Sequence, residues 1–257
     1  MKLNRTLRDC VYGMAVGDAL GVPFEFKPRG SFECVDMVGG GSHNQLAGTW
    51  SDDTSMALAL CDSYRELGRV DCDDILRRFR AWINDGAYTA DGVAFDYGNA
   101  TRKALATGRG GTGEWDKGNG SLMRCLPMAF MDCTSAEVGA VSAITHATDA
   151  CMDACEKMIR YAARLMREGA PAGESAGEPG GSSGYVWDTY NAAIWCLEHT
   201  ESYKECVLTA VNLGDDIDTT ACVAGGLAGI LYGREAIPPE WLATLRGKDV
   251  IEACLFE

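Results

Sequence analysis

Apolar residues recur every three or four positions along most of this chain, which is the spacing of amphipathic helices. The first run extends from Leu3 to Ala15, and a capping box at Thr134 opens a helix that closes around His146. Similar runs predict helices over residues 54–67, 71–83, 99–107, 149–167, 186–198 and 202–213, another after residue 216, and last turns from residue 238. The sequence shows no convincing alternating strand. The pattern therefore predicts an all-α fold, a single globular bundle of ten or more helices.

One long segment lacks this periodicity. Residues 168–184 are rich in Gly, Ser, Pro and Glu, and they cannot bury enough apolar surface to fold by themselves. We therefore expect a flexible surface loop there. This loop is not a domain boundary, because two acidic clusters that need each other lie on either side of it. The expectation is one domain spanning residues 1–257.

The chain has a formal net charge of −14 and no basic stripe, so we expect neither direct nucleic-acid binding nor an anionic-membrane surface. Its twelve cysteines show no paired CxxC spacing and indicate free thiols in a reducing compartment. The sequence has no apolar leader and no apolar stretch of membrane-spanning length. These features predict a soluble cytoplasmic protein, and the lack of an exposed apolar repeat predicts a monomer.

Two clusters of aspartates stand directly before apolar helical runs, namely Trp50-Ser51-Asp52-Asp53-Thr54 and Gly214-Asp215-Asp216-Ile217-Asp218-Thr219-Thr220. Helix capping explains one or two acceptors at each helix start, but not four carboxylates with added hydroxyls. If the two starts meet, each close pair of charges repels by about 4 kcal/mol at an effective dielectric of 20. An all-oxygen set of this kind suits Mg²⁺ first, then Mn²⁺ or Ca²⁺, and four carboxylates favour two ions.

Glycine-rich segments mark three other places. Gly13, Gly17 and Gly21 repeat every four residues, which indicates close approach of another helix or a ligand. The segment Asp116-Lys117-Gly118-Asn119-Gly120-Ser121 leads into an apolar run that we expect to be helical. Its backbone N–H groups suit an anionic or polyhydroxyl ligand, and a plain turn is the alternative. His43 lies in a Gly-rich loop, where we expect it to be solvated.

Taken together, these blocks resemble the ADP-ribosylglycohydrolase family, which includes the dinitrogenase reductase-activating glycohydrolase and the ADP-ribosyl-acceptor hydrolases. The resemblance covers about residues 9–233. It rests on the following blocks: Gly17-Asp18-Ala19-Leu20-Gly21-Val22-Pro23-Phe24-Glu25, Trp50 to Thr54, Gly118-Asn119-Gly120-Ser121-Leu122-Met123-Arg124, Thr145-His146 and Gly214 to Ala221. The chain departs from the family pattern at Asp215, where many members have a second glycine.

The resemblance implies a single-domain, orthogonal all-α bundle that holds two Mg²⁺ ions, or Mn²⁺, at the base of an ADP-ribose cleft. By residue match, the implied metal ligands are Ser51, Asp52, Asp53, Asp216, Asp218 and Thr219. The implied catalytic residues are Glu25, Asp53 and Asp116. The implied ADP-ribose-binding residues are Gly118, Asn119, Gly120, Ser121, Met123 and His146.

The implied activity is hydrolysis of the glycosidic bond between ADP-ribose and an acceptor, such as an arginine side chain of a protein or a small molecule. That reaction needs an acid for the leaving group and an activated water, which carboxylates and metal ions can supply. Two other interpretations remain open. One is a catalytically silent ADP-ribose-binding protein, and the other is a metal-dependent hydrolase of another ADP-ribose or nucleotide conjugate. A generic acidic helical domain is the remaining alternative.

Overall fold

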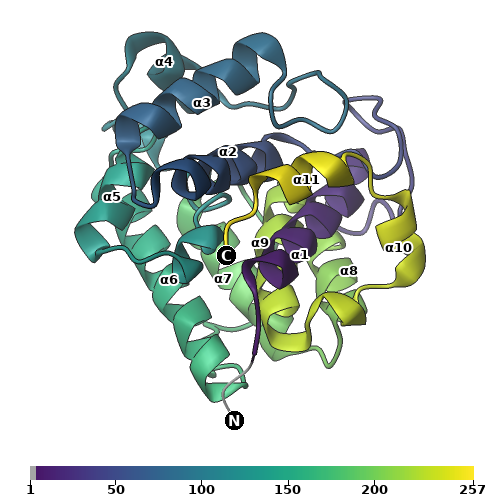
Figure 1. Ribbon diagram of the computed structural model, residues 1–257. Helices are drawn as coiled ribbons and strands as arrows, with labels where there is room; N and C mark the ends of the chain where they lie inside the picture. The colour runs from purple at the N-terminus through teal and green to yellow at the C-terminus, as the bar shows by residue number, and fades with distance from the viewer. Residues whose placement is uncertain (1–3) are drawn as a thin grey trace.

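The computed structural model describes residues 4–257, and over these residues it is built from helices joined by loops (Figure 1). The α-helices are α1 (Leu7–Gly21), α2 (Asp52–Leu67), α3 (Cys72–Asp85), α4 (Asn99–Thr107), α5 (Ser135–Ala143), α6 (Asp149–Glu168), α7 (Val186–Glu198), α8 (Tyr203–Val211), α9 (Ile217–Tyr232), α10 (Pro239–Thr244) and α11 (Lys248–Cys254). Four short 3₁₀ helices complete the set: η1 (Val22–Phe24), η2 (Glu114–Asp116), η3 (Leu126–Phe130) and η4 (Arg234–Ala236). Only isolated β-bridges occur within residues 4–257, which confirms the all-α prediction.

Most helix boundaries agree with the sequence pattern. Leu3, where we expected the first helical run to begin, lies outside the described residues. The apolar helix expected after Gly120 is wrong, because residues 121–125 form turns that lead into η3. Pro127 explains the difference, since it has no N–H group to donate within a continuous helix.

Helices α1 and α9 pack closely along their length and lie side by side in Figure 1. The glycines of α1 make this possible: a Cβ at Gly17 would overlap the carbonyl oxygen of Ala221, and one at Gly21 would overlap the backbone of Asp218. The expected close approach is therefore that of a second helix. This contact fixes the start of α9 against the end of α1.

The start of α2 is held by the same helix. The carboxylate of Asp18 accepts hydrogen bonds from the backbone N–H of Ser51 at 2.9 Å and of Thr54 at 3.1 Å. The Thr54 hydroxyl donates a third hydrogen bond at 2.6 Å. Because α1 contacts the first turns of both α2 and α9, the two acidic clusters meet at one point of the core.

Residues 169–185 connect α6 to α7 without helical structure, and many of them are exposed. The end of this segment is anchored, however: the Asp216 N–H donates to the Ser182 carbonyl at 2.8 Å, and the Asn119 N–H donates to the Gly184 carbonyl at 3.0 Å. The expectation of a surface loop thus needs correction for these last residues, which approach the acidic clusters.

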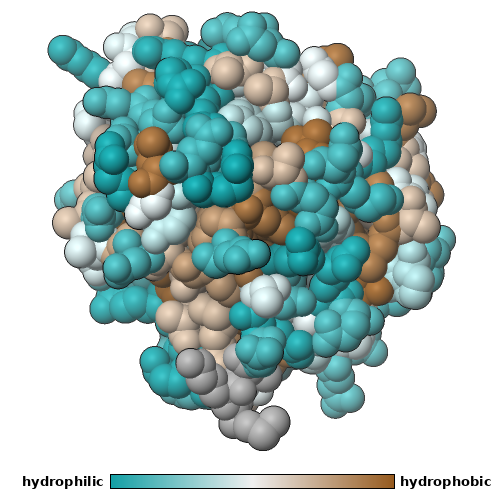
Figure 2. All heavy atoms as spheres, in the orientation of Figure 1, coloured by the Kyte–Doolittle hydropathy of each residue, from teal (hydrophilic) through white to brown (hydrophobic). Residues whose placement is uncertain are grey.

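The visible face of the molecule is mainly hydrophilic, with small separate hydrophobic groups (Figure 2). All twelve cysteines are free thiols, and most are buried among helices. Among the described helices, none has both the length and the apolar character needed to cross a bilayer.

Candidate active site

A cleft of about 990 Å³ opens above the point where α1, α2 and α9 meet. One wall consists of Glu25, Phe26 and residues 94–101, and a second wall, which adjoins it at Thr101 and Gly120, includes residues 118–120 and His146. Completing the lining are Asp52, Trp115, Met123, Ser183, Gly184, Asp215, Asp216 and Thr219. The predicted acidic clusters thus form the floor between two walls built from distant parts of the chain.

Three buried carboxylates that do not themselves line the cleft, Asp18, Asp53 and Asp218, have oxygen atoms within 4.8 Å of one another. The hydroxyl of Ser51 donates to Asp53 Oδ2 at 3.0 Å, and that of Thr219 approaches the same oxygen at 3.4 Å. Burial, together with the neighbouring carboxylates, raises the pKa of Asp53 and of Asp218 well above the usual range.

Two oxygen atoms in this group have no hydrogen-bond partner within residues 4–257, namely Asp53 Oδ1 and Asp218 Oδ1. Buried carboxylate oxygens are normally hydrogen-bonded or bound to a cation. Glu25, Asp216 and Asp218 form a second group of carboxylates, also with oxygen atoms within 4.8 Å. Because Asp218 belongs to both groups, the two groups together form a continuous set of oxygen donors of the kind that binds hard metal ions.

Asp52 differs from the other predicted metal ligands in its position. It belongs to neither of the two carboxylate groups, but it lines the cleft and is buried. Burial, followed by repulsion from Asp53 and other carboxylates, raises its pKa well above the usual range. The structure therefore places Asp52 at the upper edge of the acidic floor.

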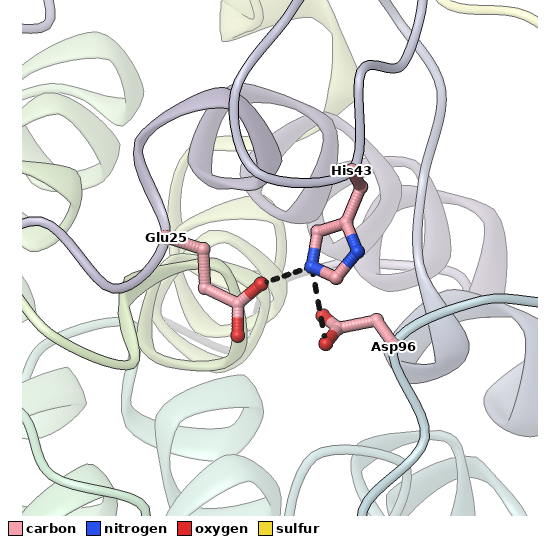
Figure 3. Close-up of side chains that lie close together, drawn as sticks. All are labelled: Glu25, His43 and Asp96. Carbon is pink, nitrogen blue, oxygen red and sulfur yellow. Dashed lines mark hydrogen bonds and ion pairs between the residues drawn. The ribbon is translucent and has the colours of Figure 1, made fainter.

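One wall of the cleft carries a cluster that the sequence did not reveal, formed by Glu25, His43 and Asp96 (Figure 3). His43 Nε2 lies 2.7 Å from Glu25 Oε2 and 3.3 Å from Asp96 Oδ1. Burial is the main reason that the pKa of Glu25 rises to about 8. Hydrogen bonds to Asp96 and Glu25 raise the pKa of His43 to about 10.

The expectation that His43 is solvated is wrong, because its side chain is only 19% exposed and contacts two carboxylates. Asp96 was not singled out, because it lies in a loop without hydrophobic periodicity, and its φ of 63° is unusual for a residue other than glycine. Asp18 was noted only as a residue near the end of the first helix. No local signal identifies these contacts, since each joins loops or helices far apart in the sequence.

Asn119 connects the second wall, formed by residues 118–120 and His146, to the acidic floor. Its side-chain amide donates to Thr189 Oγ1 at 2.9 Å and to Asp216 Oδ2 at 2.8 Å. Its neighbours Gly118 and Gly120 line the cleft with Asn119 and Met123. This segment therefore presents backbone and amide groups beside the carboxylates.

His146 also lines this wall and packs against Gly120, where a Cβ would lie 2.7 Å from His146 Cε1. Its Nδ1 is 2.8 Å from the hydroxyl of Thr145, which accepts a hydrogen bond from Arg124 at 2.9 Å. Burial, followed by repulsion from Arg124, lowers the pKa of His146 to about 3. The imidazole is therefore neutral at physiological pH.

Five residues of the expected site do not line the cleft: Ser51, Asp53 and Asp218 are buried next to lining residues, and Asp116 and Ser121 lie elsewhere. The carboxylate of Asp116 accepts a hydrogen bond from the backbone N–H of Gly113 at 2.8 Å and packs against Gly111. Ser121 is buried behind the wall, where its hydroxyl accepts a hydrogen bond from Ser142 at 2.9 Å. In this structure, Asp116 therefore holds its own loop, and Ser121 supports the wall from behind.

A helical bundle with a cluster of buried carboxylates beside a cleft belongs to the class of all-α proteins whose acidic side chains can hold a metal ion. The chain belongs to the ADP-ribosylglycohydrolase family, since the model of that family matches residues 2–179 and 156–256. This finding confirms the resemblance that the sequence motifs indicated.

Individual relatives agree with this assignment. The chain is 36% identical to the ADP-ribosylarginine hydrolase Tri1 of Pseudomonas putida (strain GB-1), over 91% of this chain and 72% of that protein. It is 33% identical to the ADP-ribosyl-[dinitrogen reductase] glycohydrolase of Rhodospirillum rubrum, over 91% and 87% of the two chains. A solved structure described as an ADP-ribosylglycohydrolase-related protein complex is similar, with a TM-score of 0.83, 30% identity and coverage of 96% and 94%. The predicted fold type is thus confirmed.

Proposed function

We propose that this protein hydrolyses the N-glycosidic bond that joins ADP-ribose to an arginine side chain of a protein. The observation that carries the proposal is the pair of carboxylate groups that share Asp218 at the cleft floor, directly beside Glu25. The two relatives described above support it, because their names specify ADP-ribosylarginine and ADP-ribosylated dinitrogen reductase as substrates.

The floor fits two Mg²⁺ ions, with Mn²⁺ as the alternative. The residues that would hold them are Ser51, Asp52, Asp53, Asp216, Asp218 and Thr219, with Asp18 as a further carboxylate in contact with Asp53 and Asp218. The unpartnered oxygens of Asp53 and Asp218 support this assignment. When bound, such ions offset the clustered negative charge, orient ribose hydroxyls and lower the pKa of a water molecule.

Hydrolysis breaks the bond between the anomeric carbon and the guanidine nitrogen, and it forms a bond from that carbon to a water oxygen. In this step the leaving nitrogen gains a proton, and the attacking water loses one to a carboxylate of the acidic floor. Glu25 is suited to supply the proton for the leaving nitrogen, because its largely buried carboxyl group lies at the cleft and burial raises its pKa above the usual range. Asp96 and His43 border this carboxyl group and exclude water from one side of it.

The second wall, formed by residues 118–120 and His146, would hold the ADP-ribose portion of the substrate. Gly118 and Gly120 offer backbone N–H groups without adding positive charge, and neutral His146 lies beside them. The amide of Asn119 is already directed at Asp216, so the same side chain links the substrate wall to the acidic floor. We further propose a monomeric, cytoplasmic protein, which the twelve free thiols support.

The deciding experiment compares proteins that carry arginine-linked or serine-linked ADP-ribose, each incubated with the enzyme in Mg²⁺ or in EDTA. We expect free ADP-ribose from the arginine linkage in Mg²⁺ and none in EDTA. Asp52→Ala and Asp216→Ala should remove turnover while the far-ultraviolet circular dichroism spectrum stays unchanged. Absence of release by metal-loaded wild-type protein would refute the hydrolase proposal and leave an ADP-ribose-binding role.

A further inference from the structure

An exposed aromatic ring stands next to Glu25 at the cleft. Phe26 is 63% exposed and lines the cleft, although its backbone has a φ of 64°. This left-handed conformation is unfavourable for a bulky residue and is usually taken by Gly, Asn or Asp. Its N–H donates to the Asp215 carbonyl at 2.9 Å, a contact that any residue except proline could make. Neither packing nor hydrogen bonding therefore explains the phenylalanine ring.

A second ring lies close by. The ring of Phe95 is 5.2 Å from that of His43, and the ring of Phe26 is 6.1 Å from it. The two phenylalanines therefore flank the cluster of Glu25, His43 and Asp96 on the same wall. Strained, exposed aromatic residues at a catalytic wall are typical of ligand contacts.

The negative charge of this wall favours a cationic ligand. Glu25, Asp52, Asp96, Asp215 and Asp216 line the cleft, and the described part of the lining contains no Lys or Arg. The His43 imidazole beside this lining already contacts two carboxylates. Aromatic faces combined with carboxylates are the environment that a planar guanidinium prefers, because the ring face attracts the cation and the oxygens accept its N–H groups.

We propose that Phe26, together with Phe95, forms the subsite that receives the guanidinium group of the arginine leaving group. This inference rests on the proposed function. If ADP-ribose lies against residues 118–120, the leaving group must face the wall that carries the proton donor Glu25. Phe26 directly follows Glu25, so its ring stacks on the group that Glu25 protonates.

The test compares three substitutions at one position. Phe26→Tyr keeps the aromatic face, Phe26→Leu keeps apolar bulk without it, and Phe26→Asn removes both while suiting the left-handed backbone. We expect kcat/KM for ADP-ribosylarginine to fall about tenfold in the Leu and Asn variants and to stay near wild type in the Tyr variant. The affinity for free ADP-ribose, measured by calorimetry, should stay within about twofold in all three, because ADP-ribose lacks the guanidinium.

Val35→Asn is the matched control, since Val35 is 62% exposed and does not line the cleft. Its kcat/KM should equal that of wild type. Phe26→Asn should also melt at the same temperature as wild type or higher, which a purely structural ring would not allow. The subsite would be refuted if the Leu and Tyr variants had equal kcat/KM. It would also be refuted if a variant lost as much affinity for free ADP-ribose as it lost in kcat/KM. If wild type itself does not cleave ADP-ribosylarginine, both the proposed function and the proposed subsite are refuted.

Discussion

Neutralising Asp218 should stabilise the metal-free protein and at the same time abolish its response to Mg²⁺. Asp218 belongs to both carboxylate groups, and its Oδ1 has no hydrogen-bond partner among residues 4–257. Asp218→Asn keeps the shape of the side chain, removes one negative charge and adds an N–H₂ donor that can reach a neighbouring carboxylate. The substitution therefore relieves repulsion without creating a cavity.

The magnitude follows from the separation of the oxygen atoms. At 4.8 Å, two ionised carboxylates repel by about 3.5 kcal/mol at an effective dielectric of 20. Asp218 has such neighbours in both groups, but protonation of some of them relieves part of the repulsion. We therefore expect the metal-free variant to gain about 2–3 kcal/mol in unfolding free energy at pH 8.

The pH dependence has a definite sign. Burial raises the pKa of Asp218 above its value in the unfolded chain, so the folded protein binds more protons than the unfolded one. Metal-free wild type should therefore lose stability as the pH rises above about 4, the ordinary pKa of an aspartate. Asp218→Asn should show a weaker decline, and the gain from the substitution should be smaller at pH 5 than at pH 8.

The assay is urea unfolding at pH 5 and pH 8, in EDTA and then in Mg²⁺, with Asp153→Asn on the exposed side of α6 as the control. Ligand at about 100 times its Kd stabilises the folded state by about 2.7 kcal/mol, so wild type should gain this much in Mg²⁺ and the variant should gain little. The advantage of the variant in EDTA should thus largely disappear in Mg²⁺, because the wild type gains about as much as the substitution gave. A variant that is less stable than wild type in EDTA at pH 8, or that gains equally from Mg²⁺, would refute this reasoning.

Three further substitutions test the packing and the site. Gly17→Ala should cost about 3 kcal/mol of unfolding free energy, since its methyl group meets the backbone of α9, whereas Gly180→Ala, with open space around it, should cost almost nothing in the same urea titration. Arg78→Leu should cost about 2 kcal/mol, because Asp62 and Asp74 would lose the buried guanidinium and keep only the more exposed Arg65 and Arg77; an unchanged melting curve would contradict this. Asp116→Asn should lower kcat by less than about tenfold in the ADP-ribose release assay, and a loss of about 100-fold or more would restore it as a catalytic residue.

The presence of most helices could be predicted from the sequence, because the features that indicate a helix lie in neighbouring residues. Helix α4 begins and ends where the pattern placed it, at Asn99 and Thr107, with Gly108 in a left-handed conformation after it. Apolar periodicity and a terminal glycine are sufficient for such an element, and they depend only on neighbouring residues. The failure after Gly120 has an equally local cause, since the proline at position 127 was not weighed against the apolar run.

The site was predictable only in part, for the same reason. The surplus of carboxylates at the starts of α2 and α9 indicated a cation site, because capping does not need so many. Asp96 and His43 gave no such surplus, and each lies in a loop whose course depends on long-range packing. Their contact with Glu25 joins three segments that no periodicity relates, so only the three-dimensional structure brings them together.

The packing that assembles the site also prevents the carboxylates from moving apart. A Cβ at Gly21 would overlap the backbone of Asp218, so the start of α9 already lies as close to α1 as the backbone allows. On its other side, α1 holds α2 through the hydrogen bonds that Asp18 accepts from Ser51 and Thr54. The metal-free protein must therefore lower its repulsion by binding protons rather than by separating the helices. Protons and metal ions then compete for the same oxygen atoms, and metal binding must release protons from the acidic floor.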